Sequence, residues 1–192
     1  MLLKKTYNNK NDEELMLLLT KREQSAFDEL YKRYSKPILN YFFRMLNYDR
    51  PKAEDLLHDL FLKIIEKPQS FDCSKKFSTW FYTLAGNMIK NEYRKQQIRN
   101  DYSGESLIEN NNTYEINGEN MDKNIFQTRL SNEINKLDAD SKTMFTLRYM
   151  EEMSIKEIAE ICDCPEGTVK SRLFYLIKNL SAKLAVYKPE TL

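Results

Sequence analysis

The sequence is poor in the residues that mark several protein classes. Its 192 residues include only four glycines and five prolines, a composition that excludes collagen-like chains and does not favour a barrel. No apolar run approaches the roughly 18 residues of a membrane span, and acidic residues follow the amino terminus before a signal-peptide core could form. We therefore expect a cytoplasmic protein with no membrane insertion.

Thiols and imidazoles are equally scarce. The three cysteines, Cys73, Cys162 and Cys164, cannot form a complete set of disulfides, in agreement with a reducing compartment. The single histidine, His58, leaves the Cys-x-Cys pair without four zinc ligands. We expect no metal site, no cofactor and no catalytic residues, because His58 has no obvious catalytic partner.

The formal net charge of +1 conceals an uneven charge distribution. Residues 75–99 contain six basic residues and one acid, and residues 165–188 contain five basic residues and one acid. Between them, residues 100–122 contain six acids and no lysine or arginine in an asparagine-rich background. This pattern predicts two small domains, residues 1–99 and 123–192, joined by a flexible acidic linker.

Apolar residues recur at intervals of three and four along both halves, which predicts an all-α fold. Pro37 and Pro51 occupy positions suited to the first turn of a helix. The expected helices cover residues 12–21, 25–34, 37–46, 51–66, 79–97, 125–137, 141–149, 155–162 and 166–184.

The carboxy-terminal half contains a helix-turn-helix pattern. Ser154 and Glu157 have the spacing of a capping box at the start of a short amphipathic helix. The letters DCP then predict a tight turn, with Pro165 near the start of a second helix. Two helices joined in this way are typical of DNA readers, although a plain helical hairpin with a solvated outer face is the alternative.

The outer face of the second helix carries side chains suited to the DNA major groove. Lysine can donate to guanine, serine can donate or accept, and an aromatic ring can contact a thymine methyl group. Arg172 lies at the margin of this face, where it could contact a phosphate or an acid of the protein itself. The candidate DNA contacts are Thr168, Lys170, Ser171, Arg172, Phe174 and Lys178.

The helix expected at residues 51–66 presents an outward acidic stripe that includes an exposed leucine, a combination that could dock a partner. The alternative is that these acids only complement the helix dipole and keep the protein soluble. The candidate docking residues are Asp55, His58, Asp59 and Leu62.

The basic segment that follows combines a lysine-bearing loop with an aromatic helix. Aromatic rings placed among cations can stack unpaired bases, at about 1–3 kcal/mol per base, which can offset the cost of unstacking them. The alternative is that Trp80, Phe81 and Tyr82 are core residues. The candidate nucleic-acid contacts are Lys75, Lys76, Trp80, Asn87, Lys90, Asn91 and Arg94.

Three strings resemble the extracytoplasmic-function (ECF) group of alternative sigma factors of bacterial RNA polymerase: AEDLLHDLFLKIIE, FSTWFYTLAGNMIKNEYRK and MSIKEIAEICDCPEGTVKSRLFYLIKNL. The resemblance implies a first domain that binds the coiled coil of the largest polymerase subunit and melts the proximal promoter element. It implies a second domain that binds the flap of the other large subunit and reads the distal element. The linker would thread toward the RNA exit channel.

On this resemblance, Asp55, His58, Asp59 and Leu62 dock polymerase, and residues 71–79 form the loop that melts DNA. Proximal contacts fall on Asn87, Lys90, Asn91 and Arg94, and distal contacts on Lys170, Ser171 and Phe174. His58 departs from the glutamine more usual in the family. An inhibitory anti-sigma protein is a further expected partner. The alternatives are a DNA-binding regulator that dimerises or senses a ligand, and a small enzyme using His58 and Cys73.

Overall fold

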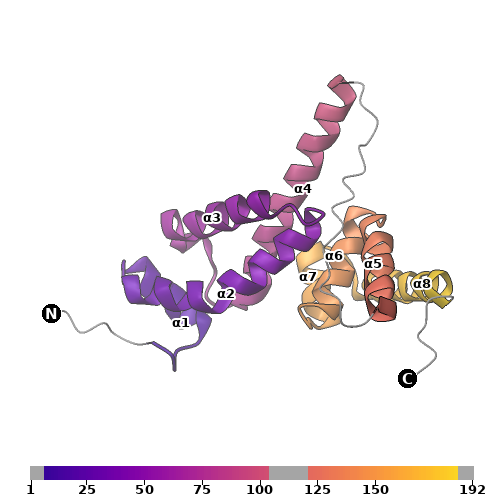
Figure 1. Ribbon diagram of the computed structural model, residues 1–192. Helices are drawn as coiled ribbons and strands as arrows, with labels where there is room; N and C mark the ends of the chain where they lie inside the picture. Colours follow the sequence, from indigo (N-terminus) through magenta and orange to yellow (C-terminus); the bar gives the residue numbers. More distant parts are fainter. Residues whose placement is uncertain (1–6, 104–120, 186–192) are drawn as a thin grey trace. The chain divides into compact units, whose positions relative to one another are not determined.

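The computed structural model describes residues 7–103 and 121–185, and every regular element in these ranges is helical. The chain divides into two compact units between Ile98 and Arg99 (Figure 1). The all-α prediction with two helical domains is thereby confirmed. None of the described helices is both long enough and apolar enough to cross a membrane.

From residue 7 onward, the first unit is built from four α-helices and a short 3-10 helix (Figure 1). Their bounds are α1 Asp12–Thr20, α2 Gln24–Met45, α3 Arg50–Glu66, η1 Pro68–Ser70 and α4 Phe77–Ser103. Pro51 lies in the first turn of α3, as predicted, where its missing N–H removes no hydrogen bond.

The prediction of two separate helices at residues 25–34 and 37–46 was wrong. α2 is continuous and contains Pro37 in its interior. Proline there removes one main-chain hydrogen bond and crowds the carbonyl group one turn earlier, at a cost of about 3 kcal/mol. Buried residues on both sides of it, Leu30, Ile38 and Tyr41, favour an unbroken helix because they all pack into the same core.

Aromatic side chains dominate the core of the first unit. Phe77 and Phe81 are fully buried and stack with ring centroids 5.1 Å apart. Phe61 of α3 meets Phe81 edge to face at 5.3 Å. These contacts attach the amino-terminal part of α4 to α3, so the polar face of α4 is held in a fixed orientation on the unit.

Over residues 121–185, the second unit contains four helices: α5 Met121–Asn135, α6 Ala139–Tyr149, α7 Ile155–Cys162 and α8 Glu166–Leu184. Phe145 of α6 and Leu176 and Leu180 of α8 form a buried cluster, against which Leu130 and Ile134 of α5 pack. The inner face of α8 follows the predicted spacing, since Val169 and Leu173 are buried too. Its outer face is therefore left on the surface.

Helices extend into both ends of the expected linker at residues 100–122. α4 ends at Ser103, and α5 begins at Met121. The sequence offers no glycine or proline between Gly86 and Gly104 that would stop α4 earlier. The predicted flexibility of the linker concerns residues 104–120, which lie outside the described residues.

Candidate functional site

The predicted docking stripe lies on the solvent side of α3. Asp49 caps the helix by accepting a hydrogen bond from the Lys52 N–H at 3.1 Å. The inward face of α3 is buried as its spacing predicts, which leaves the opposite face exposed. Each of the four candidate docking residues is exposed: Asp55, His58, Asp59 and Leu62.

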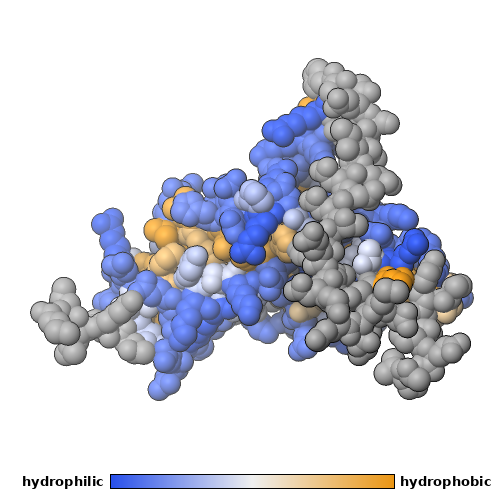
Figure 2. Space-filling model, viewed as in Figure 1, coloured by the Kyte–Doolittle hydropathy of each residue, from blue (hydrophilic) through white to orange (hydrophobic). Residues whose placement is uncertain are grey.

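An apolar groove of about 520 Å³ adjoins this stripe between α2 and α3. His58 and Leu62 line it, and Tyr31 and Ile65, which are 45% and 44% exposed, add apolar surface. Figure 2 shows an apolar strip between the two helices. Neither Tyr31 nor Ile65 was predicted from the sequence, because the groove depends on how the two helices pack.

The loop before α4 is ordered by its own side chains. Asp72 accepts hydrogen bonds from the backbone N–H and hydroxyl group of Ser74, at 3.0 and 2.8 Å. These bonds, the backbone one first, lower the pKa of the Asp72 carboxyl group. Lys75 and Lys76 are exposed directly before the helix, so both residues adjoin the first turn of α4.

Trp80 lies between core and surface. It is half-buried, and its ring lies 5.0 Å from that of Phe71 and 5.9 Å from that of Phe77. Phe81 and Tyr82 are buried, so the core interpretation holds for these two residues. Thr79 is buried as well, which leaves Trp80 and the half-buried Ser78 as the accessible groups of this turn.

Further along α4, a row of amides and cations faces solvent. Its members Asn87, Lys90, Asn91 and Arg94 are all exposed. On another side of the helix, Glu92 pairs with Lys52 of α3 at 3.0 Å, and the Tyr93 hydroxyl group donates to the Met45 carbonyl. These contacts fix the rotation of α4 about its axis and keep the polar row outward.

The helix-turn-helix is built from local caps. Ser154 accepts a hydrogen bond from the Glu157 N–H at 3.2 Å, and Glu157 accepts one from the Ser154 N–H at 2.9 Å, which confirms the predicted capping box. Asp163 ends α7 in the left-handed conformation at φ 52°, which aspartate tolerates better than most residues. The Cys164 N–H then closes the turn onto the Ala159 carbonyl at 3.0 Å.

The outer face of α8 has an open aromatic ring. Phe174 is 64% exposed, and it lines a groove of about 440 Å³ between α8 and the helices α6 and α7. Of the described residues that line this groove, three are cationic and none is acidic: Arg148, Lys170 and Lys178. A positive groove with an exposed aromatic ring suits an anionic polymer with apolar base edges.

Three predicted contacts on α8 already have partners within the protein. Lys170 Nζ lies 3.7 Å from Glu166 Oε2, in a pair whose side chains are both exposed. The Ser171 hydroxyl group donates to the Thr168 carbonyl at 3.1 Å, which leaves its oxygen able to accept. Arg172 Nη1 lies 3.4 Å from Asp140 Oδ2, and both side chains are exposed. This pair matches the internal-acid alternative for Arg172, but an exposed pair of this kind contributes only about 0–1 kcal/mol, so a phosphate could displace Asp140.

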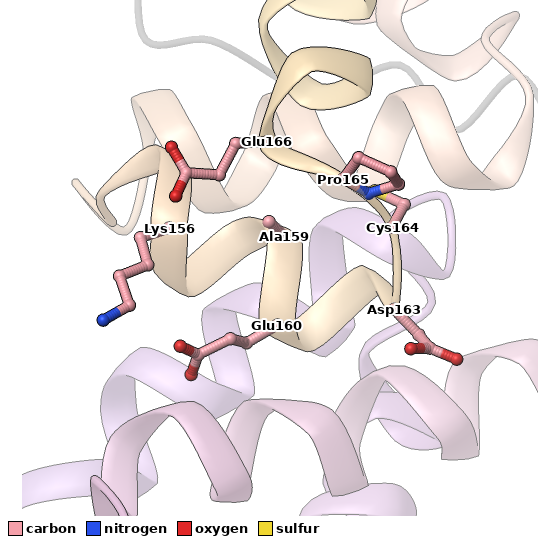
Figure 3. Close-up of a pocket in the computed structure, with 7 residues that line it drawn as sticks. All are labelled: Lys156, Ala159, Glu160, Asp163, Cys164, Pro165 and Glu166. Carbon is pink, nitrogen blue, oxygen red and sulfur yellow. The ribbon is translucent and has the colours of Figure 1, made fainter.

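A second hollow of about 470 Å³ lies at the turn between α7 and α8. Figure 3 shows its lining, in which Glu160, Asp163 and Glu166 outnumber the one cation, Lys156. This acidic lining repels phosphate, so the hollow is not part of a DNA-backbone site. Within the described ranges, no group of three metal-ligating side chains is placed to hold an ion.

Two family models match the chain, one on each unit. Residues 30–98 match sigma-70 region 2, and residues 127–178 match sigma-70 region 4. The region 2 match spans most of α2, all of α3 and most of α4, and the region 4 match spans the helix-turn-helix. Both matches therefore include the surfaces described above.

Curated relatives align over nearly the full chain. The ECF RNA polymerase sigma-E factor of Haemophilus influenzae is 32% identical over 90% of this chain and 95% of the relative. The sigma-E factor of Escherichia coli K12 is 32% identical over 85% of this chain and 88% of its own length. This chain belongs to the ECF-type RNA polymerase sigma factors. It binds core RNA polymerase, directs promoter-specific transcription initiation and is not an enzyme.

Two solved structures share the fold of this sigma factor. A structure of the sigma factor RpoE with the anti-sigma factor NepR from Bartonella quintana has a TM-score of 0.70 at 24% identity, covering 84% of this chain and 98% of that chain. A structure of CnrH with the cytosolic domain of CnrY has a TM-score of 0.68 at 20% identity, covering 91% and 97%. Both support the helical architecture.

Two residues that lie beside α8 of this sigma factor were not predicted from the sequence. Arg148 and Tyr149, at the end of α6, line the groove that contains Phe174. Arg148 also donates to the Met153 carbonyl at 2.9 Å and so holds the connection to α7. No spacing rule finds these residues, because they reach α8 only through the packing of three helices.

Proposed function

We propose that the two units of this sigma factor divide promoter recognition between them. Residues 1–99 dock the coiled coil of the largest polymerase subunit and recognise and melt the proximal element. Residues 123–192 bind the flap of the other large subunit and read the distal element, and residues 100–122 are the acidic linker between them. The division is supported by the separate region 2 and region 4 matches.

In this proposal, polymerase docks on the acidic stripe of α3. Asp55 and Asp59 supply negative charge, and Leu62 supplies apolar contact next to the groove with Tyr31. A partner helix with a basic rim and an apolar centre fits such a surface, since charge steers association and apolar burial holds the complex.

In this proposal, the DNA of the proximal promoter element lies along α4. The exposed row from Asn87 to Arg94 contacts bases and phosphates, and Lys75 and Lys76 hold the backbone at the start of the helix. Trp80 stacks an unpaired base of the melted strand. Its half-buried position supports this role, because a ring fixed on one side by Phe71 and Phe77 is preorganised for stacking on the other.

The distal element is read by α8. The observation that carries this assignment is the exposed Phe174 ring in a groove lined by three cations. Lys170 and Ser171 contact base edges, and Lys178 contacts phosphate. Thr168 and Arg172 add contacts at the margin, where Arg172 exchanges Asp140 for a phosphate.

The test is transcription reconstituted from core polymerase, this protein and a promoter selected by the complex from random sequence. Initiation should depend on the protein, and alanine at Phe174 or Lys170 should reduce it mainly by weakening binding of the distal element. Alanine at Trp80 should instead leave closed complexes intact and reduce opening. Equal opening by the Trp80 variant would refute the stacking role.

A regulator that only binds duplex DNA would start no transcription with core polymerase. We also propose that the protein acts in the cytoplasm, where core polymerase is found, and that an anti-sigma protein controls it. The two solved structures support an anti-sigma partner, because RpoE is bound there to the anti-sigma factor NepR and CnrH to the cytosolic domain of CnrY. Full-length protein should then bind promoter duplex more weakly than residues 123–192 alone, if the free protein hides its DNA faces.

A further inference from the structure

The residue directly before the first turn of α4 cannot cap the helix with its side chain. This residue is Lys76, whose ammonium group can donate hydrogen bonds but cannot accept them. The first N–H groups of a helix have no partner within the helix, and Phe77 is fully buried. An unpaired N–H at this position would be costly, because water cannot reach a buried group easily.

The cap comes from a residue 64 positions earlier in the chain. Glu13 of α1 accepts a hydrogen bond from the Phe77 N–H on its Oε1 at 2.8 Å. A carboxylate at this end also complements the positive end of the helix dipole. Glu13 thus caps the start of α4, a role that an aspartate or serine directly before the first turn has in most helices.

α1 is itself firmly attached to the unit. Asp12, next to Glu13, pairs with Arg33 of α2 at 2.7 Å and accepts a hydrogen bond from the Tyr34 hydroxyl group at 2.5 Å. Leu15 and Met16 are fully buried on the inner face of α1. Glu13 therefore lies on a firmly anchored helix, so its hydrogen bond fixes the position of the Phe77 backbone.

The residue that Glu13 holds is part of the aromatic group around Trp80. The ring of Phe77 lies 5.5 Å from that of Phe71 and 5.9 Å from that of Trp80. Glu13 also acts on the loop: after burial and Asp72, its charge contributes to raising the pKa of the Cys73 thiol. The carboxylate therefore lies near both the loop and the first turn of α4.

We infer that Glu13 is a positioning residue for promoter opening, which rests on the proposed role of Trp80 in capturing a melted base. By pinning the first N–H of α4, Glu13 holds Phe77 and Trp80 in the arrangement that receives the base. Glu13 lies in α1, outside the region 2 match, which begins at residue 30. The positioning role therefore comes from a helix that precedes the matched segment.

The test compares Glu13→Ala and Glu13→Gln with the matched control Glu14→Ala in the full-length protein. Glu14 lies next to Glu13 and belongs to the capping box of α1, but its hydrogen bonds are local to Asn11 and Lys10. Its removal weakens α1 without touching α4. Glutamine at position 13 keeps an oxygen that can accept the Phe77 N–H, so it separates loss of the bond from loss of charge.

Three quantities are measured for each variant: core polymerase affinity, the amount of heparin-resistant open complex at a selected promoter, and acrylamide quenching of Trp80, the single tryptophan of the chain. We expect Glu13→Ala to reduce open complex about 5- to 10-fold, which is the effect of the net contribution of roughly one hydrogen bond. It should make Trp80 more easily quenched and leave polymerase affinity unchanged. Glu13→Gln should retain most opening.

If Glu13→Ala opens promoters as well as the unchanged protein, or loses no more opening than Glu14→Ala, the inference is wrong. Unchanged quenching of Trp80 in Glu13→Ala would overturn it too. Trp80→Ala distinguishes these failures from a failure of the proposed function. If Trp80→Ala opens promoters normally, the proposed base-capture role of Trp80 is wrong. The quenching of Trp80 in Glu13→Ala still decides, in that case, whether Glu13 positions the ring.

Discussion

Replacing Phe174 with alanine should weaken distal-element binding without destabilising the protein. The side chain is 64% exposed, so only about a third of a phenylalanine's burial is lost from the fold, which amounts to under about 1 kcal/mol. Loss of recognition at one base pair costs about 1–3 kcal/mol, or roughly 5- to 150-fold in affinity. The effect on DNA binding should therefore exceed the effect on folding.

The neighbouring residue Tyr175 provides a matched control. It is 62% exposed, and its ring contacts that of Phe174 at 5.5 Å. Tyr175 nevertheless lines a different groove, of about 530 Å³, together with Glu133 and Lys183. Tyr175→Ala removes a similar ring with similar exposure from the other side of α8, so it should change affinity for the distal element less than about twofold if bases are read on the Phe174 side.

The assay is fluorescence anisotropy of a labelled promoter duplex with polymerase bearing each variant, at fixed ionic strength because phosphate contacts are salt-dependent. Thermal unfolding of each free variant checks stability. Base reading by Phe174 is refuted if Phe174→Ala binds the selected promoter normally, or if Tyr175→Ala is the weaker binder. Equal loss on the selected promoter and on scrambled DNA would show that Phe174 contributes no base recognition.

Three further predictions concern stability and docking. Arg33→Ala should lower the free energy of unfolding by about 2–3 kcal/mol in a urea titration, because Arg33 donates to Asp12, Glu29 and two backbone carbonyls. Burial lowers the pKa of Lys142 to about 8 from an ordinary value of 10.5. The buried charge of this lysine therefore lowers the free energy of unfolding below pH 8. This free energy rises as pH increases from 8 to 10.5, because the lysine of the folded protein loses its proton first. Lys142→Met should therefore stabilise the protein by about 1–3 kcal/mol at pH 7 and flatten the pH dependence of unfolding in that window. Asp59→Lys should weaken binding to core polymerase at least about tenfold in a competition assay, because it reverses a charge at the centre of the docking stripe.

Each of these predictions has a result that contradicts it. An Arg33→Ala variant as stable as the parent would show that α1 is held by apolar burial alone. A Lys142→Met variant less stable at pH 7 would mean that the bond from Lys142 to Asn135, 3.0 Å long, outweighs the cost of burial. For docking, Glu14→Lys is the control, because Glu14 is an exposed acid on α1 rather than on the stripe of α3, and equal losses would indicate a general charge effect.

Periodicity in the sequence was enough to assign surfaces to α3 and α8. An amphipathic helix has few ways to bury its apolar side, so the exposed positions follow once the buried ones are known. Leu62 and Phe174 were placed outside in this way, and both are exposed. The cap formed by Ser154 and Glu157 was equally predictable, because both partners lie within one helical turn.

Features that depend on two distant segments were not predictable in this way. Pro37 was expected to start a helix, but the surrounding core keeps α2 continuous. The apolar groove with Tyr31 exists only because α2 and α3 pack at a particular offset. Nothing near Phe77 in the sequence indicates that its N–H is capped from α1.

The sequence by itself determined the all-α class, the helix-turn-helix and the outward faces of its helices, since these depend on interactions that reach no further than one or two turns. Only the tertiary structure decided the length of α2, the grooves beside α3 and α8, and the bond from Glu13 to the start of α4. These depend on which segments meet in space, and that is settled by the packing of the whole core rather than by any local pattern.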